Sequence, residues 1–393
     1  MTDEKPTALI SDNSKHSLDQ RSGSPQRPQK IPRISTVEGG EEDEDGEVEE
    51  RETIVGDEDM NQKNPRLQRY LVAIEYIGTR FAGAQKQPNG RTVVGVLEEA
   101  FHKFIGQPVS IFCSSRTDAG VHALSNVCHV DVERISKRRP GEVLPPHEPD
   151  VVRRAVNHFL QKNDGDLMVT DVRCVPPDFH ARYKAQERTY FYRLLSGSEP
   201  LSIFEKDRAW HVPEELDILA MQRACRVLVG HHDFSSFRAA SCQAKSPIRT
   251  LEEISVTEVV STPYFPSLRE REESISMGDG LLAFPSEAKT DPHGYSISDE
   301  DKVKSPNGES NYEFGIRRRH HCYVVTTRAR SFLYHQVRLL VGVLKCVGTG
   351  ELTISDVERI LNAKSVTAAS PMAPACGLYL GRVKYDLSSD MSK

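Results

Sequence analysis

The chain has 393 residues, of which 37% are hydrophobic, so it can bury a sizeable core and form one large or two modest domains. Its eight cysteines are scattered without a Cys-x-x-Cys pair, which argues against a zinc ribbon or a dithiol redox motif. No apolar leader opens the chain and no run approaches the roughly 20 apolar residues of a membrane span, so we expect an intracellular, reducing compartment: cytoplasm, nucleus or organelle.

The formal net charge of −6 is unevenly distributed along the chain. Residues 1–66 hold 9 Lys and Arg against 17 Asp and Glu, and residues 261–315 hold 5 against 11. The other residues carry 37 basic and 29 acidic side chains, a net charge of +8. A basic body beside acidic segments suits a polyanionic ligand such as a nucleic acid, although an ordinary mixed surface could show the same bias.

Three segments are predicted to lie outside the folded body. Residues 1–66 are rich in Ser, Pro, Gln and acidic residues, which predicts a disordered acidic tail. This tail lacks the Arg-rich, acid-poor composition of an organelle transit peptide. Residues 261–315 are predicted to be a flexible insertion between two strands, and residues 387–393 a short C-terminal tail.

Folded structure is predicted to begin near Leu67, with a first set of alternating elements. These elements are strand 70–76, helix 94–104, strands 109–113 and 121–132, helix 151–160 and strand 167–175. The order strand–helix–strand–strand–helix–strand is that of a ferredoxin-like unit. We therefore predict an N-terminal α+β domain over residues 67–187.

A second α+β set follows, which predicts a C-terminal domain over residues 188–386. Its predicted elements are strand 189–195, helix 214–229, strands 251–259 and 321–327, helices 332–347 and 354–361, and strand 378–385. In the helix over 214–229, the residues predicted to face the core are Leu216, Leu219, Ala220 and Val227.

A polar turn lies between the strands predicted over 109–113 and 121–132. It contains Arg116 and Asp118, and Gly120 supplies the backbone freedom that a sharp turn needs. Such a turn can hold a carboxylate at the rim of a sheet, where catalytic groups are commonly placed. Taken alone, an Asp before Ala-Gly is more often a turn former than a catalyst.

Several segments of the chain, in the same order, resemble the TruA-type tRNA pseudouridine synthase family. They are Arg-Thr-Asp-Ala-Gly-Val-His-Ala at 116–123, Phe-His-Ala-Arg at 179–182, Arg-Thr-Tyr-Phe-Tyr at 188–192, Phe-Leu-Tyr-His-Gln-Val-Arg at 332–338 and Gly-Leu-Tyr-Leu at 377–380. The form at 332–338 also resembles the eukaryotic pseudouridine synthase-like branch.

The resemblance implies roles for five residues. Asp118 would be the catalytic carboxylate, which attacks the sugar or the base covalently or abstracts a proton. Arg338 would pair with Asp118 through a planar, two-pronged contact. Tyr190 is expected to pack on the target base, Leu378 to line the uracil pocket and Arg116 to brace the space that the base leaves. Without the resemblance, Tyr190 would be an ordinary strand aromatic, Leu378 a core residue and Arg338 a cation with a solvated head.

The resemblance also implies a fold and an activity. The fold is α+β, with two ferredoxin-like units forming a joined, mainly antiparallel sheet, helices on one side and a basic RNA-binding cleft. The activity is conversion of uridine to pseudouridine in tRNA, in the anticodon arm, by a homodimer without a metal or cofactor. The target base is expected to be flipped out of its stack.

Two other classes of function stay open from the sequence. One is a non-catalytic RNA-binding or RNA-folding protein on the same scaffold, which would not need Asp118, Tyr190 and Arg338 together. The other is a hydrolase built on Asp118 and His122, for which no nucleophile stands out. A metal site at 320–322 (His-His-Cys) is disfavoured, because neighbouring residues in a strand point to opposite faces.

Overall fold

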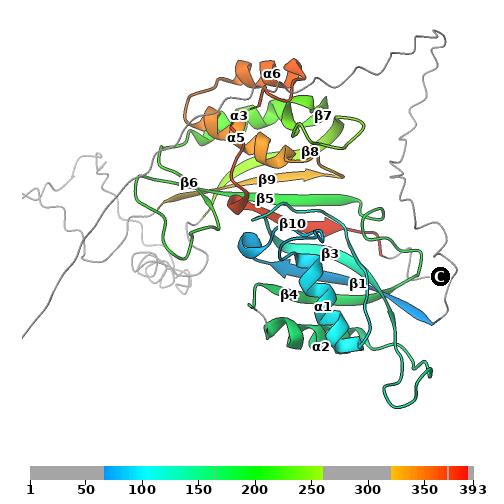
Figure 1. The fold of residues 1–393 in the computed structure, drawn as a ribbon. Helices are drawn as coiled ribbons and strands as arrows, with labels where there is room; N and C mark the ends of the chain where they lie inside the picture. The colour runs from blue at the N-terminus through cyan, green and yellow to red at the C-terminus, as the bar shows by residue number, and fades with distance from the viewer. Residues whose placement is uncertain (1–65, 163, 260–319, 370, 388–393) are drawn as a thin grey trace, which may run out of the picture. The chain divides into compact units, whose positions relative to one another are not determined.

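The computed structural model describes residues 66–162, 164–259, 320–369 and 371–387. Apart from residues 66 and 387, the segments predicted to be unstructured (1–66, 261–315 and 387–393) lie outside the described residues. The described strands form one sheet in the order β4-β1-β3-β10-β5-β9-β8-β7, with β2 paired to β3 and β6 to β5 (Figure 1).

Most neighbouring strands are antiparallel, whereas β10 runs parallel to β3 and β6 parallel to β5. The strands are β1 (Leu67–Tyr76), β2 (Ile111–Cys113), β3 (His122–Glu133), β4 (Leu167–Val175), β5 (Glu187–Ser196), β6 (Trp210–Val212), β7 (Gly230–Asp233), β8 (Ile248–Val259), β9 (His321–Ala329) and β10 (Leu378–Lys384). The sequence analysis missed β6 and β7, because strands of three or four residues are too short to show an alternating pattern.

Five α-helices lie within the described residues (Figure 1). They are α1 (Val93–Ile105), α2 (Pro149–Gln161), α3 (Ile218–Leu228), α5 (Gln336–Gly348) and α6 (Ile354–Ala363). Helix α2 packs against β4, α3 against β8, and α5 and α6 against α3. None of these helices combines the length and the apolar composition that crossing a bilayer requires.

The two halves of the sheet share one strand order. In the first half, the chain order β1, α1, β2, β3, α2, β4 becomes the spatial order β4-β1-β3-β2. In the second half, the chain order β5, α3, β8, β9, α5, β10 becomes the spatial order β10-β5-β9-β8. The predicted α+β fold with two ferredoxin-like units and a joined, mainly antiparallel sheet is confirmed, whereas the domain boundary at residue 187 stays a prediction.

Strand register carries one buried face across the junction between the halves. Tyr76 of β1 lies opposite Ala123 of β3, and Ala123 lies opposite Leu380 of β10. Leu380 lies opposite Tyr190 of β5, which in turn lies opposite Thr327 of β9. All five side chains are buried, and directly opposed residues share a face of the sheet. A continuous core layer therefore connects β1 to β9.

Two helices begin later than the sequence pattern suggests. Helix α3 begins at Ile218 instead of residue 214, because the Asp217 side chain accepts a hydrogen bond from the amide of Ala220 at 2.9 Å and caps the helix. The predicted orientation of Leu219 is wrong, since this side chain is 62% exposed. The face toward the core has helical spacing and comprises Met221, Ala224, Cys225 and Leu228. Helix α5 begins at Gln336 instead of residue 332.

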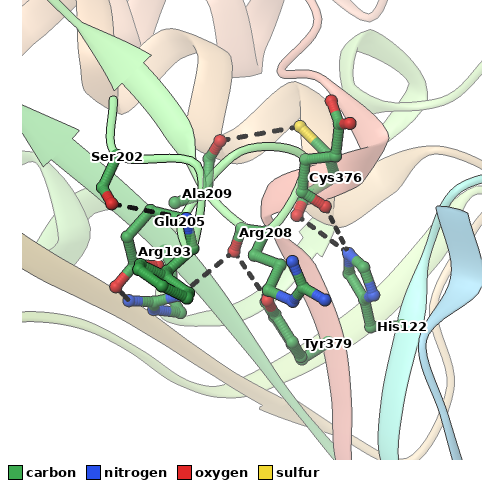
Figure 2. Close-up of polar contacts among 10 residues, drawn as sticks. His122, Arg193, Ser202, Glu205, Arg208, Ala209, Cys376 and Tyr379 are labelled. Carbon is green, nitrogen blue, oxygen red and sulfur yellow. Dashed lines mark hydrogen bonds and ion pairs between the residues drawn. The ribbon is translucent and has the colours of Figure 1, made fainter. Parts of the chain in front are cut away.

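The seam between β3 and β10 is held by a buried histidine (Figure 2). His122 Nδ1 accepts a hydrogen bond from the amide of Gly78, and Nε2 lies 3.1 Å from the carbonyl oxygens of both Asp207 and Cys376. These contacts require the neutral tautomer with its proton on Nε2, and burial lowers the pKa of the ring. Tyr379 stacks on the ring with centroids 4.6 Å apart. His122 thus ties three backbone segments together.

The loop beside this seam, residues 197–209, is fixed by a second buried contact (Figure 2). Both guanidinium amines of Arg193 reach the Glu205 carboxylate, at 2.8 and 3.1 Å, and the pair is 16% and 9% exposed. The carbonyl oxygen of Arg208 accepts hydrogen bonds from Arg193 and from the hydroxyl of Tyr379. The loop is therefore anchored to both β5 and β10.

We expect the close contact between α5 and residues 371–373 to make one glycine sensitive to substitution. A Cβ at Gly342 would overlap the carbonyl oxygen of Pro371, whereas a Cβ at Gly348 would meet only the side-chain ends of Met221 and Leu216. Gly342→Ala should lower the free energy of unfolding by about 1–3 kcal/mol. Gly348→Ala, the matched control in the same helix, should cost less because those side chains can move. Chemical denaturation measures both, and equal stability of the two variants would contradict this packing.

Candidate active site

The turn that carries Asp118 is held by one fully buried side chain, Asn126 of β3. Asn126 Oδ1 accepts hydrogen bonds from the Ser114 hydroxyl at 3.0 Å and from the amide of the next residue at 2.9 Å. Its Nδ2 donates to the carbonyl oxygen of Ser115 and to the hydroxyl of Tyr76, both at 3.2 Å. The amide thus uses both its oxygen and its nitrogen to fix the start of the turn.

The centre of the same turn is fixed from β1 and from the loop after it. Tyr76 and Thr117 share a hydrogen bond of 2.7 Å between their hydroxyls, and the amide of Ala84 donates to the Thr117 carbonyl oxygen at 3.0 Å. Gly83 approaches so closely that a Cβ there would lie 3.1 Å from that oxygen. Gly120 has φ +80°, which permits the chain to turn into β3. The Asp118 backbone is therefore held on both sides.

Two basic side chains from the start of α5 meet Asp118. Arg338 Nη1 lies 3.5 Å and His335 Nε2 lies 3.3 Å from the same carboxylate oxygen, Oδ2. The Asp118, Arg338 and His335 side chains are 23%, 12% and 18% exposed. The structure therefore brings Asp118 and Arg338 together although they are 220 positions apart in sequence. The carboxylate remains partly accessible.

The expected two-pronged pairing of Arg338 with Asp118 is wrong. Only Nη1 faces the carboxylate, while Nε donates to the carbonyl oxygen of Ala373 at 2.8 Å. The amide of Ala373 in turn donates to the carbonyl oxygen of Arg338 at 3.0 Å. The guanidinium is shared between a side chain and a backbone carbonyl, so its orientation depends on the segment before β10.

His335 is a site residue that the sequence analysis missed. It lies within the Phe-Leu-Tyr-His-Gln-Val-Arg segment, three positions before Arg338, a spacing that places two side chains on one side of a helix. Tyr334 covers the imidazole, with ring centroids 3.8 Å apart. Burial lowers the pKa of His335, the Arg338 charge acts in the same direction, and the Asp118 charge opposes both.

A second missed residue, Arg188 of β5, is a buried cation held by neutral groups. Its guanidinium donates to the Ser115 hydroxyl at 3.1 Å, to the carbonyl oxygens of Ser114 at 2.9 Å and Arg182 at 3.1 Å, and to that of Arg330. Arg188 is 8% exposed, and burial lowers its pKa from the ordinary value for arginine. One side chain therefore joins the Asp118 turn to the two turns that follow β4 and β9.

Tyr190 of β5 lies close enough to Asp118 for the carboxylate charge to act on its phenol. The Tyr190 ring is 9% exposed and meets the edge of Phe332 with centroids 5.2 Å apart. Burial raises the pKa of the phenol, while Arg188 and a hydrogen bond with Ser115 act in the opposite direction. Tyr190 is thus a neutral aromatic side chain beside the carboxylate.

The other two predicted site residues have different environments. Leu378 begins β10, is 6% exposed and lies opposite Tyr192, two residue pairs away from Leu380 opposite Tyr190. Leu378 therefore lies on the same sheet face as Tyr190. Arg116 lies two residues before Asp118 on the same turn and is exposed.

The hydrolase hypothesis is wrong for this arrangement. Both ring nitrogens of His122 contact backbone groups at the seam, and the ring is 1% exposed. A histidine fixed in this way cannot exchange protons with a substrate at Asp118. Within the part of the chain that the structure describes, no group of three or more His, Cys, Asp or Glu is arranged to hold a metal ion.

Comparison with known proteins gives matches that include Asp118, His335 and Arg338. A family model described as tRNA pseudouridine synthase matches residues 72–184 and 224–386. A tRNA pseudouridine synthase A of Rhodospirillum centenum is 38% identical over 319 residues, covering 81% of this chain and 100% of the relative. Proteins of the same name from Paramagnetospirillum magneticum and Parvibaculum lavamentivorans are each 36% identical, covering 83% and 81% of this chain and 98% and 100% of the relatives.

We expect Asn126 to contribute more to stability than an asparagine outside the site. Asn126→Leu removes four hydrogen bonds and leaves buried partners unsatisfied, so the free energy of unfolding should fall by about 2–4 kcal/mol. Asn157→Leu in α2, the control, removes two bonds to Val169 and should cost about half as much. Denaturant titration gives the two values, and hydrogen exchange should show faster opening at residues 114–118 only in the first variant. Unchanged exchange there would show that Asn126 does not hold the turn.

Proposed function

The chain belongs to the tRNA pseudouridine synthase family, and we propose that Asp118 is the carboxylate with which it converts uridine to pseudouridine in tRNA. The observation that carries this assignment is the convergence of Arg338 and His335 on one oxygen of a carboxylate held by a rigid turn. A partly buried carboxylate with two basic partners and an accessible side suits covalent catalysis. The finding favours an enzyme over a non-catalytic RNA-binding protein.

The reaction needs one carboxylate and no net redox change. The bond between N1 and C1′ breaks, the uracil turns, and a bond between C5 and C1′ forms, while C5 loses a proton and N1 gains one. Among the described residues, Asp118 accepts its side-chain contacts through Oδ2. Oδ1 is therefore the oxygen that we assign to the attack on C1′; the bond that it forms as N1 leaves breaks when C5 bonds to C1′, which restores the carboxylate.

The aromatic and apolar residues around Asp118 suit a flipped base. Tyr190 would provide a surface for the uracil, since a base taken from its stack regains about 1–3 kcal/mol by packing on an aromatic side chain. Leu378 on the same sheet face would line the apolar side of the uracil pocket. Arg116, exposed on the Asp118 turn, would brace the position that the base leaves in the RNA. These roles are part of the proposal.

The partners follow from the same assignment. The excess of basic side chains outside residues 1–66 and 261–315 suits the phosphates of tRNA, and we place the target uridine in the anticodon arm and the RNA in a basic cleft by analogy with the family. By the same analogy we propose a homodimer, without a metal or small-molecule cofactor. Because tRNA is the substrate, we place the protein inside the cell, in the cytoplasm, the nucleus or an organelle.

Asp118→Asn is the direct test of the catalytic assignment. The amide preserves the shape of the side chain and removes the negative charge of the attacking group, so pseudouridine formation should fall by at least about 1000-fold while tRNA affinity persists. The readouts are pseudouridine release from tritiated tRNA and filter binding. Asp131→Asn, which changes a 37% exposed carboxylate paired with Arg69, should retain wild-type activity. Activity near wild type in Asp118→Asn would refute the assignment.

Arg338 should be needed for orientation as well as for charge. Lysine keeps the positive charge but cannot contact Asp118 and Ala373 with two separate nitrogens, so Arg338→Lys should lower kcat by about 10- to 100-fold with little change in KM. Arg338→Ala should lower kcat further. Arg359→Lys changes a surface ion pair of α6 and serves as the control. A normal kcat in Arg338→Lys would leave charge as the only contribution of Arg338.

A further inference from the structure

His335 has a backbone conformation that is uncommon for a residue other than glycine. Its φ is +65°, in the left-handed region, and it is the residue immediately before α5. The surrounding turn enforces this conformation. The amide of Leu333 donates to Gln336 Oε1 at 2.8 Å, and the amide of Gln336 donates back to the Leu333 carbonyl oxygen at 3.0 Å. The carbonyl oxygen of Tyr334 accepts a hydrogen bond from the amide of Ala239 at 3.0 Å. Strained residues held by their surroundings concentrate at functional sites.

The side chain of His335 reaches the carboxylate that the proposed function makes catalytic. Its Nε2 is 3.3 Å from Asp118 Oδ2, while Arg338 Nη1 approaches the same oxygen from the first turn of α5 at 3.5 Å. The contact lies within hydrogen-bond distance, and a neutral imidazole can use it as a donor only when its proton is on Nε2. Among the described residues, the hydrogen bond that the Asp118 carboxylate accepts comes from Arg338 Nη1 to Oδ2, and Oδ1 accepts none.

We propose, on the basis of the proposed function, that His335 is a positioning residue: its neutral form donates from Nε2 to Asp118 Oδ2 and presents Oδ1 to the nucleoside, and its protonation slows the reaction. The physical reason is a difference in charge. The neutral ring orients the carboxylate without adding a formal charge beside it. The imidazolium would form a full ion pair with Oδ2 in addition to that of Arg338, and would reduce the electron density available for attack.

The groups that face His335 set the direction of its pH dependence. Asp118 favours the imidazolium, Arg338 disfavours it, and Tyr334 covers the ring and contributes to its burial. Burial is the largest influence, and the pKa of His335 lies below its ordinary value of 6.5. His335 is therefore neutral at pH 7, and kcat should fall as the pH drops through this lowered pKa.

Substitutions of His335 separate hydrogen bonding from backbone strain. Gln places an amide nitrogen about as far from the backbone as Nε2 of histidine. His335→Gln should therefore keep kcat at pH 8 within about 5-fold of the wild-type value, and should no longer show the fall in kcat at low pH that His335 produces. Asn tolerates the left-handed conformation better, but its amide is too short, so His335→Asn should lose about 10- to 100-fold in kcat with little change in KM. A purely structural role predicts the opposite order, with Asn more active than Gln.

His147→Gln changes a histidine whose pKa is also lowered by burial but which contacts Phe104, so its pH profile should match wild type. The proposal would be overturned by an unchanged fall in kcat at low pH in His335→Gln, or by higher activity in His335→Asn than in His335→Gln. The wild-type protein in the same assay tests the proposed function itself. If it forms pseudouridine while the variants give either of these results, only the role proposed for His335 is refuted.

A spectroscopic measurement tests the contact without relying on activity. The Asp118 charge raises the pKa of His335, so removing it in Asp118→Asn should lower the pKa that NMR reports for the Cε1 proton of His335. The signal is assigned by its loss in His335→Gln. The pKa of His147 should stay the same in both proteins. An unchanged His335 pKa in Asp118→Asn would show that the two side chains do not interact in solution.

Discussion

The short parallel pairing of β10 with β3 is the contact on which the proposed active site depends. Only two residue pairs form it, Tyr379 with His122 and Leu380 with Ala123. Immediately before β3 lies the turn with Asp118, and shortly before β10 lies Ala373, which orients the guanidinium of Arg338. The same seam therefore sets the position of the carboxylate and of its cationic partner. Because so few backbone bonds hold this seam, the buried contacts of His122 across it carry much of its stability.

Several buried polar side chains hold the turn that carries Asp118. Asn126 holds its first residues, Tyr76 and Thr117 hold its centre, and Arg188 crosses from β5 to the carbonyl oxygen of Ser114. Among the described residues, the guanidinium of Arg188 donates to carbonyl and hydroxyl oxygens. A buried positive charge of this kind favours anionic groups nearby.

The start of α5 combines three properties that are rarely found together. It presents Arg338 and His335 toward Oδ2 of Asp118, and His335 has a strained backbone conformation. The next turn packs so closely on residues 371–373 that only a glycine fits at position 342. Close packing restricts the position of the helix to within a fraction of an ångström. Such precision suits the proposed attack of Asp118 on one atom of a nucleoside, because small misplacements reduce the rate steeply.

The order of the main elements in both α+β units could be predicted from the sequence, because alternating and helical patterns arise among neighbouring residues. Asp118, Tyr190 and Arg338 were singled out by motifs that resemble those of a known family. Helix starts were less accurate. The left-handed backbone at His335 and the cap at Asp217 depend on hydrogen bonds that the hydrophobic pattern does not report.

Which groups contact the Asp118 carboxylate depends on the packing of segments that are remote in sequence. With β10 in parallel register beside β3, Arg338 Nη1 lies 3.5 Å from Oδ2 of Asp118, although the two residues are 220 positions apart. The Nε of Arg338 instead donates to the carbonyl oxygen of Ala373, in the segment before β10. The three-dimensional structure also places His335 beside Oδ2 of Asp118 and the Arg188 guanidinium against the hydroxyl of Ser115. Both contacts join segments that are remote in sequence. Spacing along a chain fixes which side chains share a face, whereas the packing of one segment on another fixes which atoms meet.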